Sequence, residues 1–182
     1  MKFSIFRKLL VNSIIPIICV IFLFQHCKPS KIIPIESKTT SEDRIALRIA
    51  AESCNLDNIK SLIKNAVNIN DTYYFGATSL HYATSGGCLE VIKFLVEEGI
   101  DINTTDAFGW TALHYAARKG HLEITKFLLE NGANPLAKNK DKKTPLDLAV
   151  EELNNNKEKK DIYEEIINLL SRASVTAVII LR

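Results

Sequence analysis

The hydrophobic positions of this chain follow two different patterns. Residues 9–24, LLVNSIIPIICVIFLF, form one run of mostly apolar side chains. From residue 45 onward, apolar residues recur at helical spacing, and glycines or polar stretches separate one group from the next. The pattern therefore predicts an N-terminal apolar segment, followed by a series of short amphipathic helices.

The helical part of the chain repeats itself every 33 residues. So many matches at one spacing indicate a structural period rather than coincidence. The matching positions include leucine (Leu47, Leu80, Leu113, Leu146), alanine (Ala50, Ala83, Ala116, Ala149), threonine (Thr78, Thr111, Thr144) and glycine (Gly87, Gly120).

One repeat predicts two helices. The first follows Thr111 and ends at Gly120, because glycine adopts positive φ at little cost. The second covers residues 122–131, with apolar side chains on one face, and Gly132 ends it. In the next repeat, Thr144 precedes Pro145, which places an N-cap before a proline at the first helical position.

These motifs resemble the ankyrin repeat. The matching segments are T-A-L-H-Y-A-A at 111–117 with G-H-L-E at 120–123, T-S-L-H at 78–81, and T-P-L-D at 144–147. The resemblance implies an all-α fold, an ankyrin-repeat α-solenoid of helix-turn-helix units joined by β-hairpin-like loops. It covers residues 45–170 in about four units, 45–72, 73–105, 106–138 and 139–170.

The two ends of the repeat array depart from the motif, as terminal repeats commonly do. The first unit lacks the threonine motif and has Cys54 where later units have glycine. The last unit has Asp147 in place of histidine, and about eight extra residues, 154–161, which we expect to lengthen its first helix or its loop. Residues 171–182 form a C-terminal tail that either caps the last helix, is disordered, or exposes an apolar patch.

Residues 1–26 predict a signal peptide or membrane anchor. A short basic stretch precedes an apolar run that is shorter than the roughly 20 residues of a spanning helix. Cys27 follows directly, and this arrangement resembles a bacterial lipoprotein signal, in which that cysteine receives the lipid. The family's small residue before the cysteine is His26 here, and its leucine is Phe24. A lipoprotein, an uncleaved signal anchor and an ordinary secretion signal therefore all remain open.

Residues 27–44 are polar and contain prolines, so they predict a tether, with Ser41 as the N-cap of the first helix. We expect the protein to be membrane-anchored in a bacterial cell envelope, with the repeats outside the cytoplasm. The net charge is +2, of which the leader carries +3 and the remainder −1. This near-neutral body argues against nucleic acid binding, which needs a basic face.

No catalytic or metal-binding arrangement is recognisable in the sequence. His81 and His114 share the repeat period, and the resemblance implies a structural hydrogen-bonding role for both. No C-x-x-C pair or phosphate-binding glycine loop occurs. We therefore predict a non-catalytic protein-protein interaction scaffold without cofactor or metal, and a monomer with a protein partner. The alternative is an inhibitor or protective partner that masks a specific enzyme sterically.

Cys54 and Cys88 fall at nearly equivalent positions in adjacent repeats. Units of this family stack about 10 Å apart, whereas a disulfide needs Cα atoms within about 7 Å. We therefore expect two free thiols.

The resemblance places partner contacts on the loop tips and on the concave face of the first helices. These positions are rich in aromatic residues and arginine, which are enriched at binding hot spots. For Tyr82, Tyr115 and Trp110, packing against the neighbouring unit is the preferred interpretation, and partner contact is the alternative. The predicted partner-binding residues are Tyr73, Tyr74, Phe75, Asp106, Phe108 and Trp110 at the tips, and Tyr82, Tyr115, Arg118 and Lys119 on the concave face.

Overall fold

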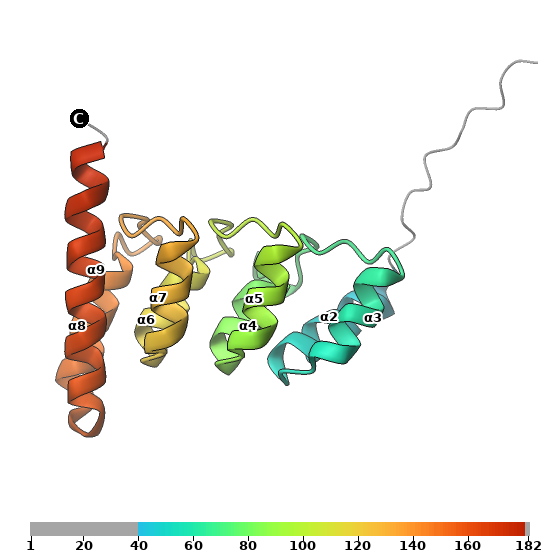
Figure 1. The fold of residues 1–182 in the computed structure, drawn as a ribbon, viewed down its shortest axis with the longest axis horizontal. Helices are drawn as coiled ribbons and strands as arrows, with labels where there is room; N and C mark the ends of the chain where they lie inside the picture. Colours follow the sequence, from blue (N-terminus) through green and yellow to red (C-terminus); the bar gives the residue numbers. More distant parts are fainter. Residues whose placement is uncertain (1–39, 181–182) are drawn as a thin grey trace, which may run out of the picture. The chain divides into compact units, whose positions relative to one another are not determined.

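A computed structural model describes residues 40–180 (Figure 1). The leader, Cys27 and most of the predicted tether lie outside the described residues. Within residues 40–180 the chain is helical, without a β-strand. The α-helices are α2 (Ser41–Glu52), α3 (Leu56–Lys64), α4 (Ser79–Gly86), α5 (Leu89–Glu97), α6 (Ala112–Lys119), α7 (Leu122–Glu130), α8 (Pro145–Asn155) and α9 (Lys160–Ile180). There are also two short 3-10 helices, η1 (Tyr74–Gly76) and η2 (Lys157–Lys159).

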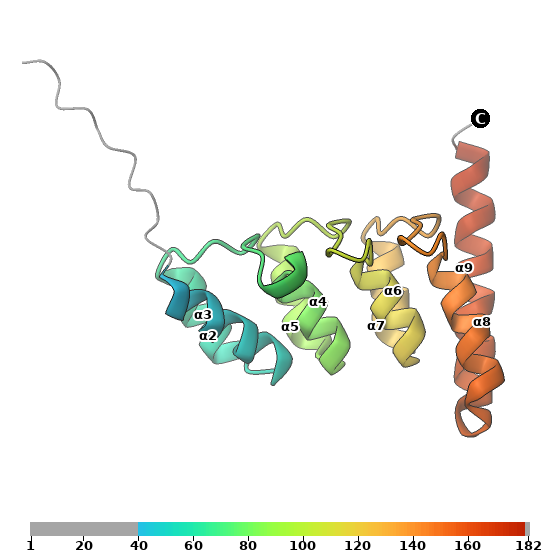
Figure 2. The same ribbon diagram turned by 180° about the vertical axis from the view of Figure 1, so that it is seen from behind.

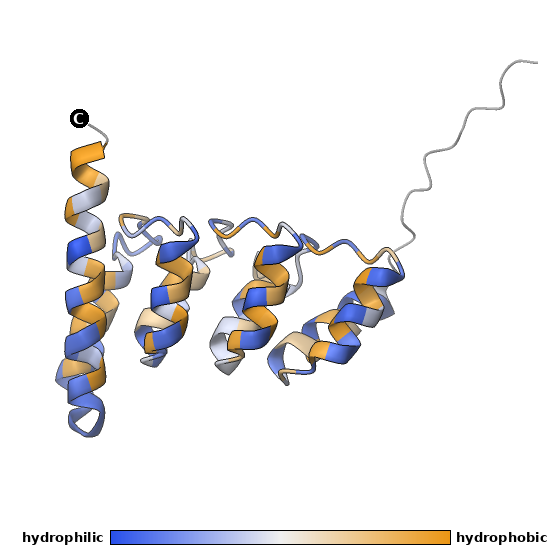
Figure 3. Cartoon of the chain, viewed as in Figure 1, coloured by the Kyte–Doolittle hydropathy of each residue, from blue (hydrophilic) through white to orange (hydrophobic). Residues whose placement is uncertain are grey.

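The helices form two stacked rows (Figures 1 and 2). The inner row contains α2, α4, α6 and α8, and the outer row contains α3, α5, α7 and α9. Leu47, Leu80 and Leu113 are fully buried between the rows, as are the alanines of the repeat. Hydrophobic residues recur along every helix of the stack (Figure 3), and the buried ones form one continuous core. Alanine at the repeated position allows neighbouring inner helices to pack closely, which explains why the period carries that residue.

Threonine caps begin the inner helices. Thr78, Thr111 and Thr144 each form a reciprocal capping box with the residue three positions later. The expected cap at Ser41 was wrong by one residue, because Thr40 takes this place. Its hydroxyl accepts the Asp43 N–H at 3.1 Å, and Asp43 accepts the Thr40 N–H in return, whereas Ser41 has no acidic residue three positions later.

The loop tips are β-hairpin-like turns that bond to one another. Each tip is closed by a backbone hydrogen bond across four residues, and successive tips are joined by a further bond. The closing bonds are Tyr73 N to Ala77 O (2.8 Å), Asp106 N to Trp110 O (2.9 Å) and Asn139 N to Lys143 O (3.0 Å); the joining bonds are Ala107 N to Phe75 O (2.6 Å) and Lys140 N to Phe108 O (3.0 Å). The tips therefore form one continuous row.

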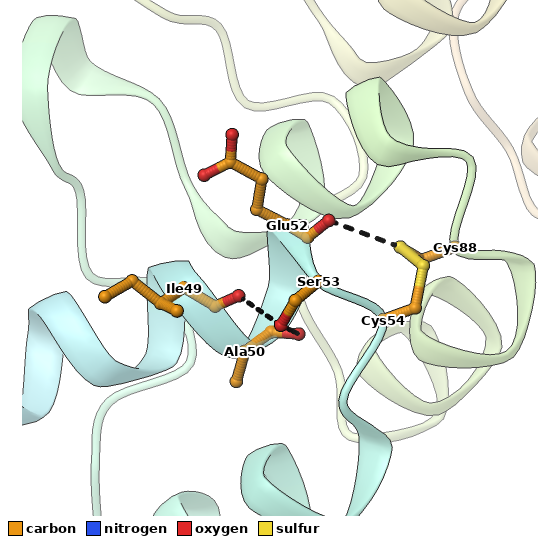
Figure 4. Close-up of a disulfide and its surroundings, with 6 residues drawn as sticks. All are labelled: Ile49, Ala50, Glu52, Ser53, Cys54 and Cys88. Carbon is orange, nitrogen blue, oxygen red and sulfur yellow. Dashed lines mark hydrogen bonds between the residues drawn. A yellow bond between two sulfur atoms is a disulfide. The ribbon is translucent and has the colours of Figure 1, made fainter.

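Cys54 and Cys88 form a disulfide, so the expectation of two free thiols was wrong (Figure 4). Their Cα atoms lie 5.1 Å apart. The spacing between stacked units applies to equivalent positions, but Cys88 lies one residue beyond the equivalent of Cys54. There the chain returns toward the preceding unit, and the Cys88 sulfur lies 3.9 Å from the Glu52 carbonyl oxygen. The disulfide joins the first unit to the second.

The extra residues of the last unit are divided between a longer helix and a turn. Helix α8 continues to Asn155, and η2 follows before α9 begins. Residues 171–180 continue α9 as helix, with Val175, Ile179 and Ile180 exposed. Among the described helices, none has the length and apolar character needed to cross a bilayer.

Candidate functional site

The most exposed aromatic side chains of the described residues lie on the loop tips. Tyr74, Phe75 and Phe108 are 74%, 69% and 53% exposed, respectively. The rings of Phe75 and Phe108 lie 5.5 Å apart between centroids, on consecutive tips. We call these three residues the tip ridge.

Phe75 has an unusual backbone conformation. Its φ is +59°, in the left-handed region that bulky side chains rarely adopt. The Phe75 carbonyl accepts the Ala107 N–H, so the conformation belongs to the bond between tips. Because the side chain is exposed, little burial offsets the cost of holding phenylalanine there. The bond between tips explains the backbone conformation of Phe75, whereas no contact within the fold accounts for its large exposed side chain beyond the neighbouring Phe108 ring.

Tyr73 and Tyr82 pack against one another. Their rings meet edge to face at 5.7 Å, and both side chains are half-buried. Burial is the main cause that raises the pKa of Tyr73 far above its usual range. The Arg48 guanidinium lies over the Tyr82 ring at 5.4 Å. Tyr73 therefore contributes more to packing within the fold than its exposed sequence neighbour Tyr74 does.

Asp106 is buried and supports the second tip. One carboxylate oxygen accepts the backbone N–H groups of Phe108 (2.8 Å) and Trp110 (2.9 Å). The other oxygen accepts the Tyr115 hydroxyl at 2.7 Å. Burial and this bond raise the pKa of Tyr115 above its ordinary value. Asp106 therefore holds Phe108 in place, and both of its carboxylate oxygens already accept hydrogen bonds from its own unit.

Trp110 lies between the tips and the inner helices. Its ring is 5.0 Å from that of Tyr115, and the Arg118 guanidinium lies over it at 5.3 Å. Arg118 also contacts Glu152 of α8 at 3.3 Å. Arg118 and Lys119 are exposed at the end of α6, so both are available to a partner on the inner face.

Two hollows flank the tip ridge. One, of about 180 Å³, brings together Tyr74, Phe75, Tyr82, Phe108 and Tyr115. The structure thus unites most of the predicted tip and concave residues in one place. The other hollow, of about 270 Å³, lies beside Tyr73 and Tyr74 and is lined from α2.

The residues that α2 contributes were missed by the sequence analysis. Arg44, Ile45 and Arg48 line the hollow beside α2, at the N-terminal end of the inner face. Glu52 lines the hollow at the tip ridge. The repeat register extends to the first unit through Leu47 and Ala50, but this unit lacks the threonine motif from which the inner-face contacts were assigned. The spacing of 44, 45, 48 and 52 on one helical face is the signal that would have identified them.

His81 and His114 have the structural role that was expected. In each, Nδ1 accepts the backbone N–H of the capping threonine, at 3.0 and 3.1 Å. Each Nε2 lies near a carbonyl oxygen of the next repeat, Trp110 at 3.0 Å and Lys143 at 3.2 Å. Burial lowers the pKa of both imidazoles. Each histidine thus caps its own helix and bonds to the next unit.

Stacked helix pairs, a row of bonded tips and a concave inner face define a repeat-built interaction scaffold. Family models described as ankyrin repeats (many copies) match residues 47–87, 80–129 and 110–149. The chain belongs to the ankyrin repeat family, and its all-α solenoid was correctly predicted. Members of this family are generally non-catalytic modules with protein partners. A comparison with curated proteins found no match. Within the described residues, no three His, Cys, Asp or Glu side chains converge as metal ligands would.

Proposed function

We propose that this chain is a scaffold that binds a protein partner through the tip ridge and the adjoining inner face. The observation that carries the proposal is Phe75, an exposed aromatic residue held at positive φ beside two further exposed aromatic side chains. Aromatic side chains supply large contact area at a low entropic cost. The half-buried Tyr82 and Tyr115 form the floor on which such a partner would rest.

The ridge can be tested with a double substitution, Phe75→Asn with Phe108→Ala. Asparagine tolerates positive φ, so the tip is expected to keep its shape. Partners are captured from native membranes by crosslinking to the full chain, and the affinity of the partner found is then measured for each variant. We expect the double variant to bind tenfold to a hundredfold more weakly, because exposed aromatic residues dominate such interfaces.

The matched control is Val175→Ala with Ile179→Ala, which removes exposed apolar area from α9 instead. Equal binding by the ridge variant and the wild type would exclude the ridge as the contact surface. If the captured protein is an enzyme that loses activity on binding, steric masking becomes the function of the same surface.

We further propose that the scaffold is membrane-tethered in a bacterial envelope, with the repeats outside the cytoplasm. The leader and Cys27 support this through their resemblance to a lipoprotein signal. The Cys54–Cys88 disulfide adds independent support, since disulfides persist in oxidising compartments and are rare in the cytosol.

The intact mass of the protein extracted from its native membranes tests the tether. We expect the mass of residues 27–182 plus acyl groups, because the acyl chains would hold the domain on the bilayer. The mass of the uncleaved chain would make the leader a signal anchor. The mass of a cleaved chain without acyl groups would contradict the tether.

A further inference from the structure

A third hollow lies at the far end of the inner face, away from α2. It measures about 430 Å³ and is formed by the end of α6, the end of α8, η2 and the start of α9. We call it the basic hollow, and its principal lining residues are Trp110, Arg118, Lys119, Glu152, Lys159 and Tyr163.

The far wall of the basic hollow comes from the extra residues of the last unit. Helix α6 ends at Lys119, whereas α8 extends to Asn155, and η2 then brings Lys159 to the hollow. A last unit without the extra residues would have no such wall. The hollow is therefore a feature of this chain rather than of the repeat.

Tyr163 fixes the base of the hollow. Its side chain is buried, and its hydroxyl donates to the Arg118 carbonyl oxygen at 2.9 Å. The ring packs so closely on Gly120 that a Cβ there would lie 3.2 Å from it. This contact joins the end of α6 to α9, the two helices that carry Lys119 and Tyr163 on the walls of the hollow.

Cations outnumber carboxylates in the basic hollow. Arg118 is paired with Glu152, which leaves that pair neutral. Lys119 and Lys159 are exposed, and neither forms an ion pair with any residue in the 40–180 range. Burial chiefly lowers the pKa of His121, and the charges of Lys159 and Lys119 lower it further, so both charges act on the same region. Two unpaired positive charges thus border a cavity that has an aromatic wall.

We propose that the basic hollow binds an acidic segment of the partner protein. Its Asp or Glu carboxylates would pair with Lys119 and Lys159, while its chain would lie against Trp110. The proposal rests on the scaffold function above and names the chemistry of the partner. The hollow at the tip ridge is lined instead by Glu52 and Asp106, so the carboxylates of an acidic segment would favour the basic hollow over it.

Trp110 is the only tryptophan of the chain, so its fluorescence reports on this hollow directly. The full chain is titrated with an octapeptide of alternating Asp and Glu, and with the matched Asn and Gln octapeptide. We expect a saturable change in emission with the acidic peptide only. The affinity should fall as the NaCl concentration rises from about 0.05 to about 0.5 M, because salt screens exposed charges.

The test variant is Lys119→Gln with Lys159→Gln, which we expect to bind the acidic peptide at least fivefold more weakly. The control variant, Lys64→Gln with Lys126→Gln, removes the same charge from exposed positions on the outer helices α3 and α7 and should bind as the wild type does. Unchanged emission up to about 1 mM acidic peptide, or equal binding by the test variant, would overturn the proposal.

Vesicles of phosphatidylglycerol and phosphatidylcholine provide the remaining comparison. If they bind through the same two lysines while the acidic peptide does not, the hollow recognises an anionic membrane surface and the peptide proposal is wrong. A failure of peptide binding, or binding of vesicles in its place, leaves the scaffold function untouched. The capture of a partner through the tip ridge is measured separately with the Phe75 and Phe108 variant.

Discussion

Reduction of the Cys54–Cys88 disulfide is expected to lower the free energy of unfolding by about 3–4 kcal/mol. The two cysteines are 34 residues apart, and closing a loop of this length restricts the unfolded chain by about that amount. Urea unfolding followed by circular dichroism, with and without a reducing agent, measures the difference. The Cys54→Ser variant serves as the control, because it should already be destabilised and should not respond to the reductant.

The loss of stability should be greatest in the first unit. Helices α2 and α3 have a neighbouring unit on one side only, and Ile59 is the one buried residue of α3. Hydrogen exchange in residues 41–64 should therefore accelerate more on reduction than exchange in α6 and α7. A midpoint shift equivalent to less than about 0.5 kcal/mol would show that packing alone holds the first unit in place.

The fold could be predicted because each repeated residue has a local physical task. Thr111 caps α6, Gly120 ends it at φ +74°, and Ala116 allows close packing, so the motif specifies the unit without reference to distant parts of the chain. Repetition then specifies the stack, since equivalent residues meet equivalent residues. The histidine bonds between units follow from the same period.

The disulfide, the basic hollow and the exposure of single tip residues depend on local departures from the 33-residue period, so the period alone does not predict them. The disulfide forms because Cys88 lies one position away from the equivalent of Cys54. The basic hollow depends on how the extra residues divide between α8 and η2. The adjacent tyrosines Tyr73 and Tyr74 look alike in the sequence, yet a single turn leaves Tyr73 half-buried and Tyr74 exposed. Asp106 was predicted to contact a partner, but it is buried and both of its carboxylate oxygens accept hydrogen bonds from its own unit.

The substitution His114→Ala is expected to lower the free energy of unfolding by about 3 kcal/mol. The imidazole is fully buried, so its removal creates a cavity. It also leaves the Thr111 N–H without its acceptor and removes the bond to the Lys143 carbonyl oxygen. Urea unfolding measures the loss. His114→Asn is the informative comparison, because it can keep an acceptor near Thr111 but is too short to reach the next unit, so it should recover only part of the loss.

The pH dependence of stability reports on the buried imidazoles, and His121, whose pKa burial also lowers, contributes equally to the wild type and to the variant. Burial lowers the pKa of His114 and His81 in the folded state, so the unfolded state binds more protons. Their contribution is therefore fully present above about pH 6.5 and is lost as the pH falls toward the folded-state pKa, by up to about 1.4 kcal/mol per pH unit for each histidine. Hydrogen bonds with Thr40 and Thr144 lower the pKa values of Asp43 and Asp147 from those of ordinary carboxyl groups, so neither group titrates between pH 5 and 7. His114→Ala should give a shallower slope than the wild type in this range, and an equal slope would mean that His114 is not held neutral by the fold.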